Sequence, residues 1–333
     1  MSESKQSTHW ASTEETGVYW GMRLMVMIHR LFGRSAFRLL LYPTVAYYFI
    51  TNRRARTASR DYLQHLEDFV PEIGLRNTLL TSFRHFYSFA EGVLDKIIVW
   101  LGDYDFSQVR FHGYDEFCKL LDCGAGAMII GAHIGNMEVC RAMAEKRKTV
   151  RLNILVHTQH MEKYNKLLRN VDSRSAMQLI QVTSLNPAMA ISLYEKIQQG
   201  ECLILVGDRI PINSSTRTIN ISFLGEKAAF SQGPYLLAAM LQCPVYTFCS
   251  IRGDDGHYDI YLDPLEQQVN IPRRNPQRRA AIEYYAQRYV DRLQTYCLKA
   301  PLQWFNFFPF WEKHGADKTG QSGKTGQQQV SSD

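Results

Sequence analysis

The chain lacks a hydrophobic run long enough to cross a membrane, although 45% of its 333 residues are hydrophobic. The apolar segment from Leu39 to Ile50 is short and contains Pro43, whereas a transmembrane helix needs about 20 apolar residues. Acidic residues stand among the first 18 positions, and no compact apolar core with a cleavage site follows them. This pattern is not that of a signal peptide. We therefore expect neither a transmembrane helix nor export.

Paired cysteines are also missing. The chain has seven cysteines, an odd number, and no Cys-x-x-Cys pair, which argues against a disulfide framework and a structural zinc site. Several cysteines stand in apolar stretches such as Cys202-Leu-Ile-Leu-Val206, where a reduced, buried thiol is the common state. The pattern predicts free thiols and indicates a reducing compartment, or the membrane face of one.

The motifs of nucleotide-dependent and esterase chemistry are absent. Gly124-Ala-Gly126 precedes a strand pattern instead of following one, so it does not fit the dinucleotide-binding fingerprint, and no Walker-type GxxxxGK[ST] sequence occurs. The chain also has no GxSxG nucleophile elbow. This last absence argues against a serine esterase and against a covalent acyl-enzyme intermediate.

A metal centre is not expected either. His157, His160 and Glu162 follow a predicted strand, and all three side chain types can bind a metal ion. They do not, however, form a recognised ligand pattern such as HExxH. We expect no bound metal, and a substrate-facing loop is the more economical interpretation of His157.

Positive charge is modest in amount but arranged in a stripe. The net charge is +6, and four arginines recur near the N-terminus at helical spacing: Arg23, Arg30, Arg34 and Arg38. On a helix they would lie opposite apolar residues. Together with the apolar run that follows, they predict an interfacial, membrane-associating helical segment. The alternative is an ordinary pair of helices packed on the core.

The remaining pattern alternates short apolar runs with helical repeats, which is typical of an α/β fold with a mixed, largely parallel sheet flanked by helices. We expect strands at Met128–Ala132, Leu152–Val156, Gln178–Val182, Leu203–Gly207, Ile219–Phe223, Val245–Ile251 and Tyr258–Leu262. We expect helices at Ala58–Phe69, Leu79–Trp100, Asn136–Glu145, Pro187–Gln198 and Tyr235–Leu241. A last helix is signalled by Asn275 as its cap and Pro276 at its first position.

These elements divide the chain into four parts. We expect a polar N-terminus at residues 1–17, a helical membrane-associating region at 18–105, an α/β domain at 106–314 and a disordered tail at 315–333. The tail is expected because the chain from Thr319 onward has no apolar anchor.

His133 and Glu138 stand at a predicted strand-to-helix junction. In open α/β sheets, ligands bind at the carboxyl ends of the strands. Asn136 is a candidate N-cap that would place Glu138 in the first helical turn. A histidine held by a carboxylate at one ring nitrogen keeps the other as a proton acceptor. The alternative is a packed histidine beside an unrelated surface glutamate.

Asp208 and Arg209 directly follow the apolar strand pattern at Cys202–Val206, so they fall at the same kind of strand end. The planar guanidinium of an arginine can clamp a phosphate or carboxylate, and the aspartate can orient it or steady the substrate. We therefore expect both residues to join the site made by His133. A capping ion pair at the edge of the sheet is the alternative.

Gly225, Ser231 and Gly233 belong to a glycine-containing block that precedes the apolar helix at Tyr235–Leu241. Ser231 is a candidate N-cap or the start of a helix that faces an anion. A glycine turn followed by a cap would explain the block without any ligand.

Together these blocks resemble the lipid A biosynthesis acyltransferase family, within the wider glycerolipid acyltransferases. The resemblance spans roughly residues 18–312 and rests on the spacing of His133 and Glu138, on Gly207-Asp208-Arg209 and on the block from Phe223 to Pro234. The closing segment that begins Pro301-Leu-Gln-Trp304 is similar to the family's Pro-x-x-Trp ending, but the usual Trp-x-x-His-x-Arg continuation is missing. The chain thus resembles a divergent branch of the family.

The resemblance implies that His133 is a general base with Glu138 as its orienter. It also implies substrate-binding roles for Gly225, Ser231 and Gly233, and we expect Asn136, Asp208 and Arg209 to bind substrate with them. The implied activity is transfer of a fatty acyl group from acyl carrier protein, or second from coenzyme A, to a hydroxyl or amine of a lipid acceptor. No bound cofactor is expected. Two alternatives on the same fold are a non-catalytic, membrane-associated lipid-binding protein and a lipid hydrolase.

The implied location is the cytoplasmic face of the bacterial inner membrane. A basic cluster at Arg273, Arg274, Arg278 and Arg279 has no nucleic-acid reader motif, so no nucleic acid partner is expected. Docking of the acidic acyl carrier protein explains this cluster, and so does simple solvation. The acceptor (a lysophospholipid, a glycolipid, an aminoacyl lipid or a polyene-type acid), the acyl chain length and the oligomeric state all stay open.

Overall fold

The computed structural model describes residues 27, 31, 38–100, 103–146, 150–156, 177–181, 187–210 and 217–311. Most of the predicted arginine stripe, the candidate metal ligands His157, His160 and Glu162, and the C-terminal tail lie outside these residues.

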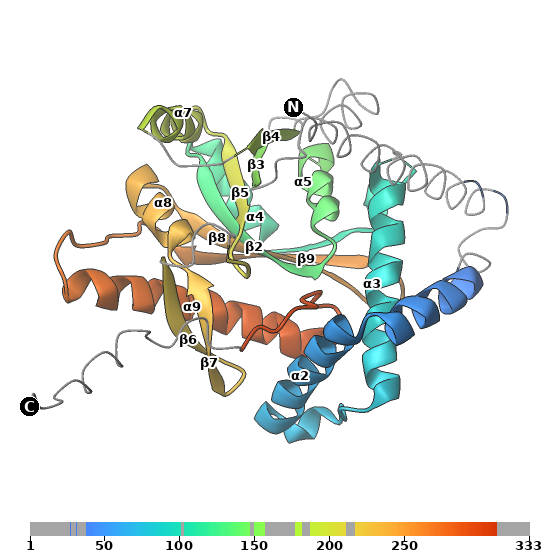
Figure 1. Cartoon of the computed structure of the whole chain (residues 1–333). Helices are drawn as coiled ribbons and strands as arrows, with labels where there is room; N and C mark the ends of the chain where they lie inside the picture. The colour runs from blue at the N-terminus through green and yellow to red at the C-terminus, as the bar shows by residue number, and fades with distance from the viewer. Residues whose placement is uncertain are drawn as a thin grey trace, which may run out of the picture.

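A mixed sheet forms the centre of the molecule, and within the described residues it has seven strands (Figure 1). The strand order is β1-β9-β8-β2-β5-β3-β4. The strands are β1 (Arg110–His112), β2 (Ala127–Gly135), β3 (Leu152–Val156), β4 (Met177–Gln181), β5 (Cys202–Val206), β8 (Val245–Arg252) and β9 (Tyr258–Glu266). Among these seven described strands, β8 and β9 pair antiparallel and the other neighbours pair parallel. The predicted α/β class with a mixed, largely parallel sheet is therefore confirmed.

A separate hairpin joins β6 (Thr218–Phe223) and β7 (Glu226–Ser231) in antiparallel register. Its two connecting residues, Leu224 and Gly225, have φ of 50° and 86°. Two successive positive φ values are the signature of the tight turn that best matches the twist of a hairpin. β7 was not expected from its sequence, because its first residues are charged and have low strand propensity.

The helices cover the sheet and extend beyond one of its edges (Figure 1). They are α2 (Arg53–Phe69), α3 (Leu79–Trp100), α4 (Tyr114–Asp122), α5 (Arg141–Lys146), α7 (Pro187–Gln198), α8 (Gly233–Leu241) and α9 (Gln277–Lys299), with short 3₁₀ helices η1 (Pro71–Ile73), η2 (Phe106–Gln108) and η3 (Met137–Cys140). α3 and α7 have the predicted bounds. The predicted helix that follows Asn136 begins as the 3₁₀ turn η3 and continues as α5.

Two helix starts differ from the expectation. α2 begins at Arg53 instead of Ala58, because the Asn52 side chain accepts a hydrogen bond from the Ala55 backbone N–H at 3.1 Å and so caps the helix earlier. At α9, Pro276 occupies the cap position and makes no side-chain cap, so the predicted capping by Asn275 is wrong. Proline has no donor or acceptor in its side chain, and the helix starts after it.

β2 runs through the middle of the sheet and is buried along almost its whole length. Met128 and Ile130 pack into one core cluster with residues of α8 and α9, whereas Ile129 packs into the opposite cluster with Phe117 of α4 and Met143 of α5. Alternate residues of a strand point to opposite faces. Helices on both faces therefore explain why this strand is an unbroken apolar run.

Residues 38–51 are helical and pack with α2 and α3 around a third cluster that contains Leu41, Val45, Phe86 and Leu94. No helix among the described residues has both the length and the apolar character needed to cross a membrane. The membrane association of this region stays a prediction. All seven cysteines lie within the described residues and are free thiols, which confirms that part of the sequence analysis.

Candidate functional site

His133 lies near the carboxyl end of β2, where the strand bends toward η3. Gly135 permits this bend. Its φ is +61°, and a Cβ atom on it would lie 1.6 Å from the carbonyl oxygen of Ser250, so no other residue fits there without a shift of the backbone. The backbone C=O of His133 accepts a hydrogen bond from the N–H of Phe305 at 2.7 Å. The C-terminal segment thus fixes the backbone at this position.

The imidazole of His133 is held by Asp208. Nδ1 of His133 lies 2.8 Å from Oδ1 of Asp208, and the backbone N–H of His133 donates to Oδ2 at 2.8 Å. The indole Nε1–H of Trp304 donates to the same Oδ2 at 2.9 Å. Burial by itself would raise the pKa of Asp208, but the charge of His133 and the hydrogen bonds from His133 and Trp304 lower it below its ordinary value.

This geometry sets the state of the histidine. An ionised Asp208 can only accept hydrogen bonds, so Nδ1 of His133 carries a proton and, in the neutral ring, Nε2 is left as an acceptor. The His133 side chain is 32% exposed, whereas that of Asp208 is fully buried. The site therefore combines a buried, anchored carboxylate with a base that a substrate can reach.

Glu138 is placed differently from the expectation. We expected its carboxylate to orient His133, but in the structure Asp208 makes the hydrogen bond to the His133 ring. The Glu138 carboxylate forms an ion pair with Nζ of Lys96 on α3 at 3.3 Å. Its backbone N–H donates to the side-chain oxygen of Asn136 at 3.1 Å, so the predicted capping by Asn136 is confirmed.

Arg209 is next to Asp208, as the sequence requires, and points toward the C-terminal segment. Nη2 of Arg209 donates to the carbonyl of Phe305 at 3.3 Å, and its guanidinium lies 5.9 Å from the ring centre of Phe308. Burial lowers the pKa of Arg209, and the charge of Asp208 opposes this shift. The structure thus brings His133, Asp208 and Arg209 together around residues 304–308.

The β6–β7 block lies on the other side of Trp304. The ring of Phe223, at the end of β6, lies 5.3 Å from that of Trp304. Gly225 forms the hairpin turn, and Ser231 Oγ accepts a hydrogen bond from the N–H of Gly233 at 3.2 Å. The N-cap of α8 is Gln232, so the predicted capping by Ser231 is displaced by one residue. In this structure the three predicted residues serve a turn and a helix start.

Trp304 has a role at the site that was not expected from the sequence. It is fully buried. In addition to its indole contact with Asp208, its backbone carbonyl accepts a hydrogen bond from Nε2 of His85 at 2.9 Å. Nδ1 of His85 in turn lies 3.0 Å from Oγ of Ser59. The Pro-x-x-Trp resemblance was the one signal of Trp304 in the sequence, and nothing in it linked the indole to Asp208.

The chain matches the family of bacterial lipid A biosynthesis acyltransferases over residues 4–313. It belongs to this family. A comparison with curated proteins finds no match. Membership makes the chain an acyltransferase of bacterial lipid biosynthesis, and the resemblance seen in the sequence is confirmed.

A metal site in this acyltransferase has no candidate within the described part of the chain, where no group of three or more His, Cys, Asp and Glu side chains could hold an ion. The histidines at positions 157 and 160 are not among those residues. The expectation of a metal-free site therefore stays a prediction.

Proposed function

We propose that this acyltransferase moves a fatty acyl group from a thioester donor to a hydroxyl or amine of a lipid acceptor, with His133 as the general base. The observation that carries the proposal is the Asp208 contact to Nδ1 of His133, which leaves Nε2 ready to accept a proton. Acyl carrier protein is the first donor candidate and coenzyme A the second.

The reaction needs no covalent enzyme intermediate. Nε2 of His133 takes the proton of the acceptor group as its oxygen or nitrogen attacks the thioester carbonyl. The tetrahedral intermediate then collapses, the carbon–sulfur bond breaks, and the departing thiolate takes the proton back from His133. Asp208 stays ionised throughout and stabilises the imidazolium, which agrees with the lowered pKa of this carboxyl.

Arg209 and backbone amides are the candidates for stabilising the oxyanion. Arg209 supports this role because it directly follows Asp208 and its guanidinium donates a hydrogen bond to the Phe305 carbonyl, beside the catalytic pair. Gly225, Ser231, Gly233 and Asn136 are proposed to bind substrate.

The proposed location is the cytoplasmic face of the bacterial inner membrane. Apolar side chains on the helix at residues 38–51 support contact with lipid, since Leu39 and Ile50 are 72% and 71% exposed. The arginines at the start of α9 are proposed to dock acyl carrier protein, an acidic partner.

Purified protein, an acyl thioester and a bacterial lipid extract would test the proposal, with mass spectrometry of the acylated products. We expect transfer by the wild type and a loss of at least about 100-fold in His133→Ala. Normal rates in this variant with both thioesters would overturn the assignment of the base. Release of free fatty acid with no acceptor present would indicate a hydrolase instead, and lipid binding without turnover a non-catalytic protein.

A further inference from the structure

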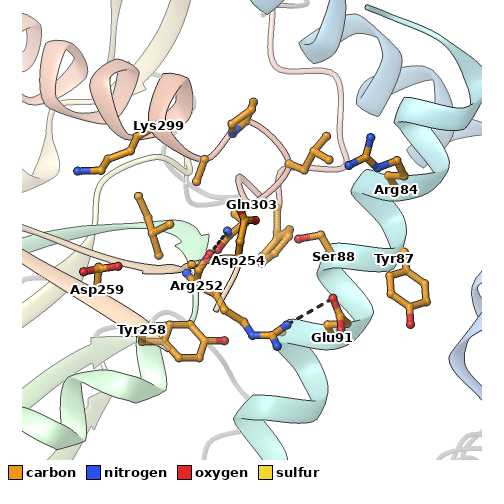
Figure 2. A pocket seen from close by; sticks show the side chains of 18 of the residues that line it. Arg84, Tyr87, Ser88, Glu91, Arg252, Asp254, Tyr258, Asp259, Lys299 and Gln303 are labelled. Atoms are coloured by element: carbon orange, nitrogen blue, oxygen red, sulfur yellow. Dashed lines mark hydrogen bonds and ion pairs between the residues drawn. The ribbon is translucent and has the colours of Figure 1, made fainter. Parts of the chain in front are cut away.

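A cavity of about 810 Å³ lies between α3, the β8–β9 turn and the segment that follows α9 (Figure 2). Its wall includes Gly135, Gln303 and Phe305, but His133 does not line it. Trp304, between the last two wall residues in the chain, directs its indole to Asp208. The cavity is therefore a neighbour of the catalytic pair, and the C-terminal segment forms the wall nearest to that pair.

Four cationic side chains line the cavity: Arg38, Arg84, Arg252 and Lys299. Arg38 and Arg252 are both held by the carboxylate of Glu91. Lys299 lies over the ring of Tyr261, with Nζ 4.2 Å from its centre. Arg84 makes no hydrogen bond, ion pair or ring contact with any described residue. Within the described part of the chain, Arg84 and Lys299 thus have no carboxylate partner.

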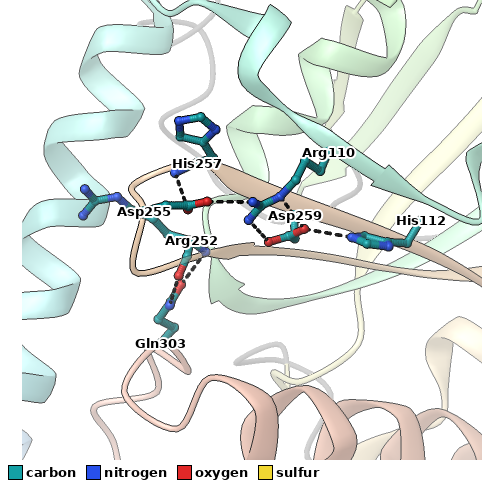
Figure 3. A network of polar contacts seen from close by, with 7 residues as sticks. All are labelled: Arg110, His112, Arg252, Asp255, His257, Asp259 and Gln303. Atoms are coloured by element: carbon teal, nitrogen blue, oxygen red, sulfur yellow. Dashed lines mark hydrogen bonds and ion pairs between the residues drawn. The ribbon is translucent and has the colours of Figure 1, made fainter.

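The carboxylates of the lining do not cancel this charge. Asp259 accepts hydrogen bonds from Arg110 at 2.9 Å and from His112 at 2.8 Å (Figure 3). The Glu91 carboxylate forms ion pairs with Arg38 and Arg252. Asp254, on the β8–β9 turn, is the lining carboxylate that has no partner among the described residues. Two cations without a carboxylate partner outnumber one carboxylate without a partner, so the cavity favours an anionic ligand. The negative charge of Asp254 would repel that ligand.

One side of the cavity is apolar and open. Leu80 and Tyr42 belong to the lining and are also 69% and 51% exposed. The ring of Tyr42 lies 4.6 Å from that of Tyr87, which joins the helix at residues 38–51 to the rim. A soluble phosphate would leave these apolar side chains in water, whereas the acyl chain of a lipid would cover them.

We propose that this cavity binds the phosphate-bearing headgroup of a membrane lipid, with the head at Arg84 and an acyl chain along Leu80 and Tyr42, while Lys299 adds positive charge from the opposite side (Figure 2). Charged hydrogen bonds from cations to phosphate oxygens supply the recognition of the head. The site is distinct from the centre at His133 and does not depend on acyl transfer.

The test is titration calorimetry with monomeric dihexanoyl phosphatidic acid, compared with glycerol 3-phosphate and inorganic phosphate. We expect the lipid to bind at least about tenfold more tightly than either head alone, because only the lipid covers the apolar side. Arg84→Gln should weaken lipid binding by about fivefold, and Lys299→Gln should weaken it by less, because Lys299 acts on the head only through its charge. Asp254→Asn should strengthen it, because this change removes the opposing charge.

Arg292→Gln is the matched control, since Arg292 is exposed on α9 and does not line the cavity. It should bind the lipid as the wild type does. His133→Ala should also keep full binding, so a failure of the proposed catalysis would leave this result intact. Unchanged affinity in both Arg84→Gln and Lys299→Gln would overturn the proposal, and equal affinity for inorganic phosphate would show a free-anion site instead.

Discussion

Asp208 uses both of its oxygens at once, and this explains why a buried carboxylate is tolerated beside a histidine. One oxygen holds Nδ1 of His133, and the other accepts the backbone N–H of His133 and the indole N–H of Trp304. A buried charge is costly unless it is paired and hydrogen-bonded. Glu138, in contrast, pairs with Lys96 and keeps part of its surface in solvent.

Asp208→Asn should lower kcat by at least about 100-fold and Glu138→Gln by less than about tenfold. An asparagine amide cannot stabilise the imidazolium as a carboxylate does, whereas loss of the Glu138 charge leaves the Asp208 contact in place. Steady-state rates with a saturating thioester would measure both. A loss in Glu138→Gln as large as that in Asp208→Asn would restore the orienting role that the sequence analysis gave to Glu138.

Gly135→Ala should destabilise the protein by about 3 kcal/mol or more, because its Cβ would overlap the Ser250 carbonyl. Gly124→Ala is the matched control. Gly124 has a similar φ of +74° but open space around it, so this change should cost only about 1 to 2 kcal/mol for the left-handed backbone. Urea denaturation measures both values. Equal losses of unfolding free energy in the two variants would mean that the contact with Ser250 does not affect stability.

At the scale of elements, the segment at residues 301–305 joins the helical layer to the sheet. Its Gln303 carbonyl accepts the N–H of Gly135 at 2.8 Å, and its Trp304 carbonyl accepts Nε2–H of His85 from α3. A carbonyl can only accept, so Nε2 of His85 carries a proton, and in the neutral ring that burial favours Nδ1 accepts from Ser59 of α2. His85 must be neutral for this arrangement.

The protein should therefore become less stable as the pH falls, because the folded state disfavours protonation of His85. Burial lowers the pKa of His85 from 6.5 to about 4, although its bond to Trp304 opposes the shift. Below pH 6.5 His85 binds a proton in the unfolded chain but stays neutral in the folded chain. The contribution of His85 to the free energy of unfolding is therefore complete above pH 6.5 and is lost progressively toward pH 4. It amounts to about 3 kcal/mol.

His85→Gln should remove this part of the pH dependence, as measured by urea denaturation between pH 4 and 6.5. Other titrating groups contribute equally to both proteins, so the difference between the two curves isolates His85. His257→Gln, on the β8–β9 turn, is the control variant and should follow the wild type. Parallel curves for the wild type and His85→Gln would contradict the prediction.

Element lengths explain which parts of the fold could be predicted. α3 was expected with its observed bounds because its helical repeat persists over 22 residues. β1 was not expected, since it has three residues and only one of them, Phe111, is even partly buried. Such a short strand exists because β9 offers it a parallel partner, and no local pattern records that neighbour.

At the scale of the whole molecule, the helix at residues 38–51 turns one side to the core and the other outward. Leu41 and Val45 are buried, whereas Leu39, Tyr47 and Ile50 are at least 64% exposed. A soluble surface does not normally gather large apolar side chains in this way. Their position next to the lipid cavity proposed above supports a single membrane-facing side.

The double change Leu39→Ser and Ile50→Ser should weaken binding to phospholipid vesicles by at least about tenfold, as measured by sedimentation with vesicles. The free energy of unfolding should hardly change, because both side chains are exposed. Ile191→Ser on α7 is the control, since Ile191 is also 59% exposed and lies on a different helix. Equal vesicle binding by all three proteins would argue against a membrane-facing side.

The sequence by itself determined the fold class, most of the helices and strands, and the region of the site. Those features depend on local periodicity and on which residues stand at strand ends, and both can be identified from neighbouring residues in the sequence. Only the tertiary structure decided that Asp208 holds His133 and that Trp304 steadies Asp208. β2 and β5 pair in parallel, with Gly131 opposite Val206, and this register carries His133 and Asp208 to the same edge. A hydrogen bond between residues so distant in sequence depends on strand order, which local patterns do not contain.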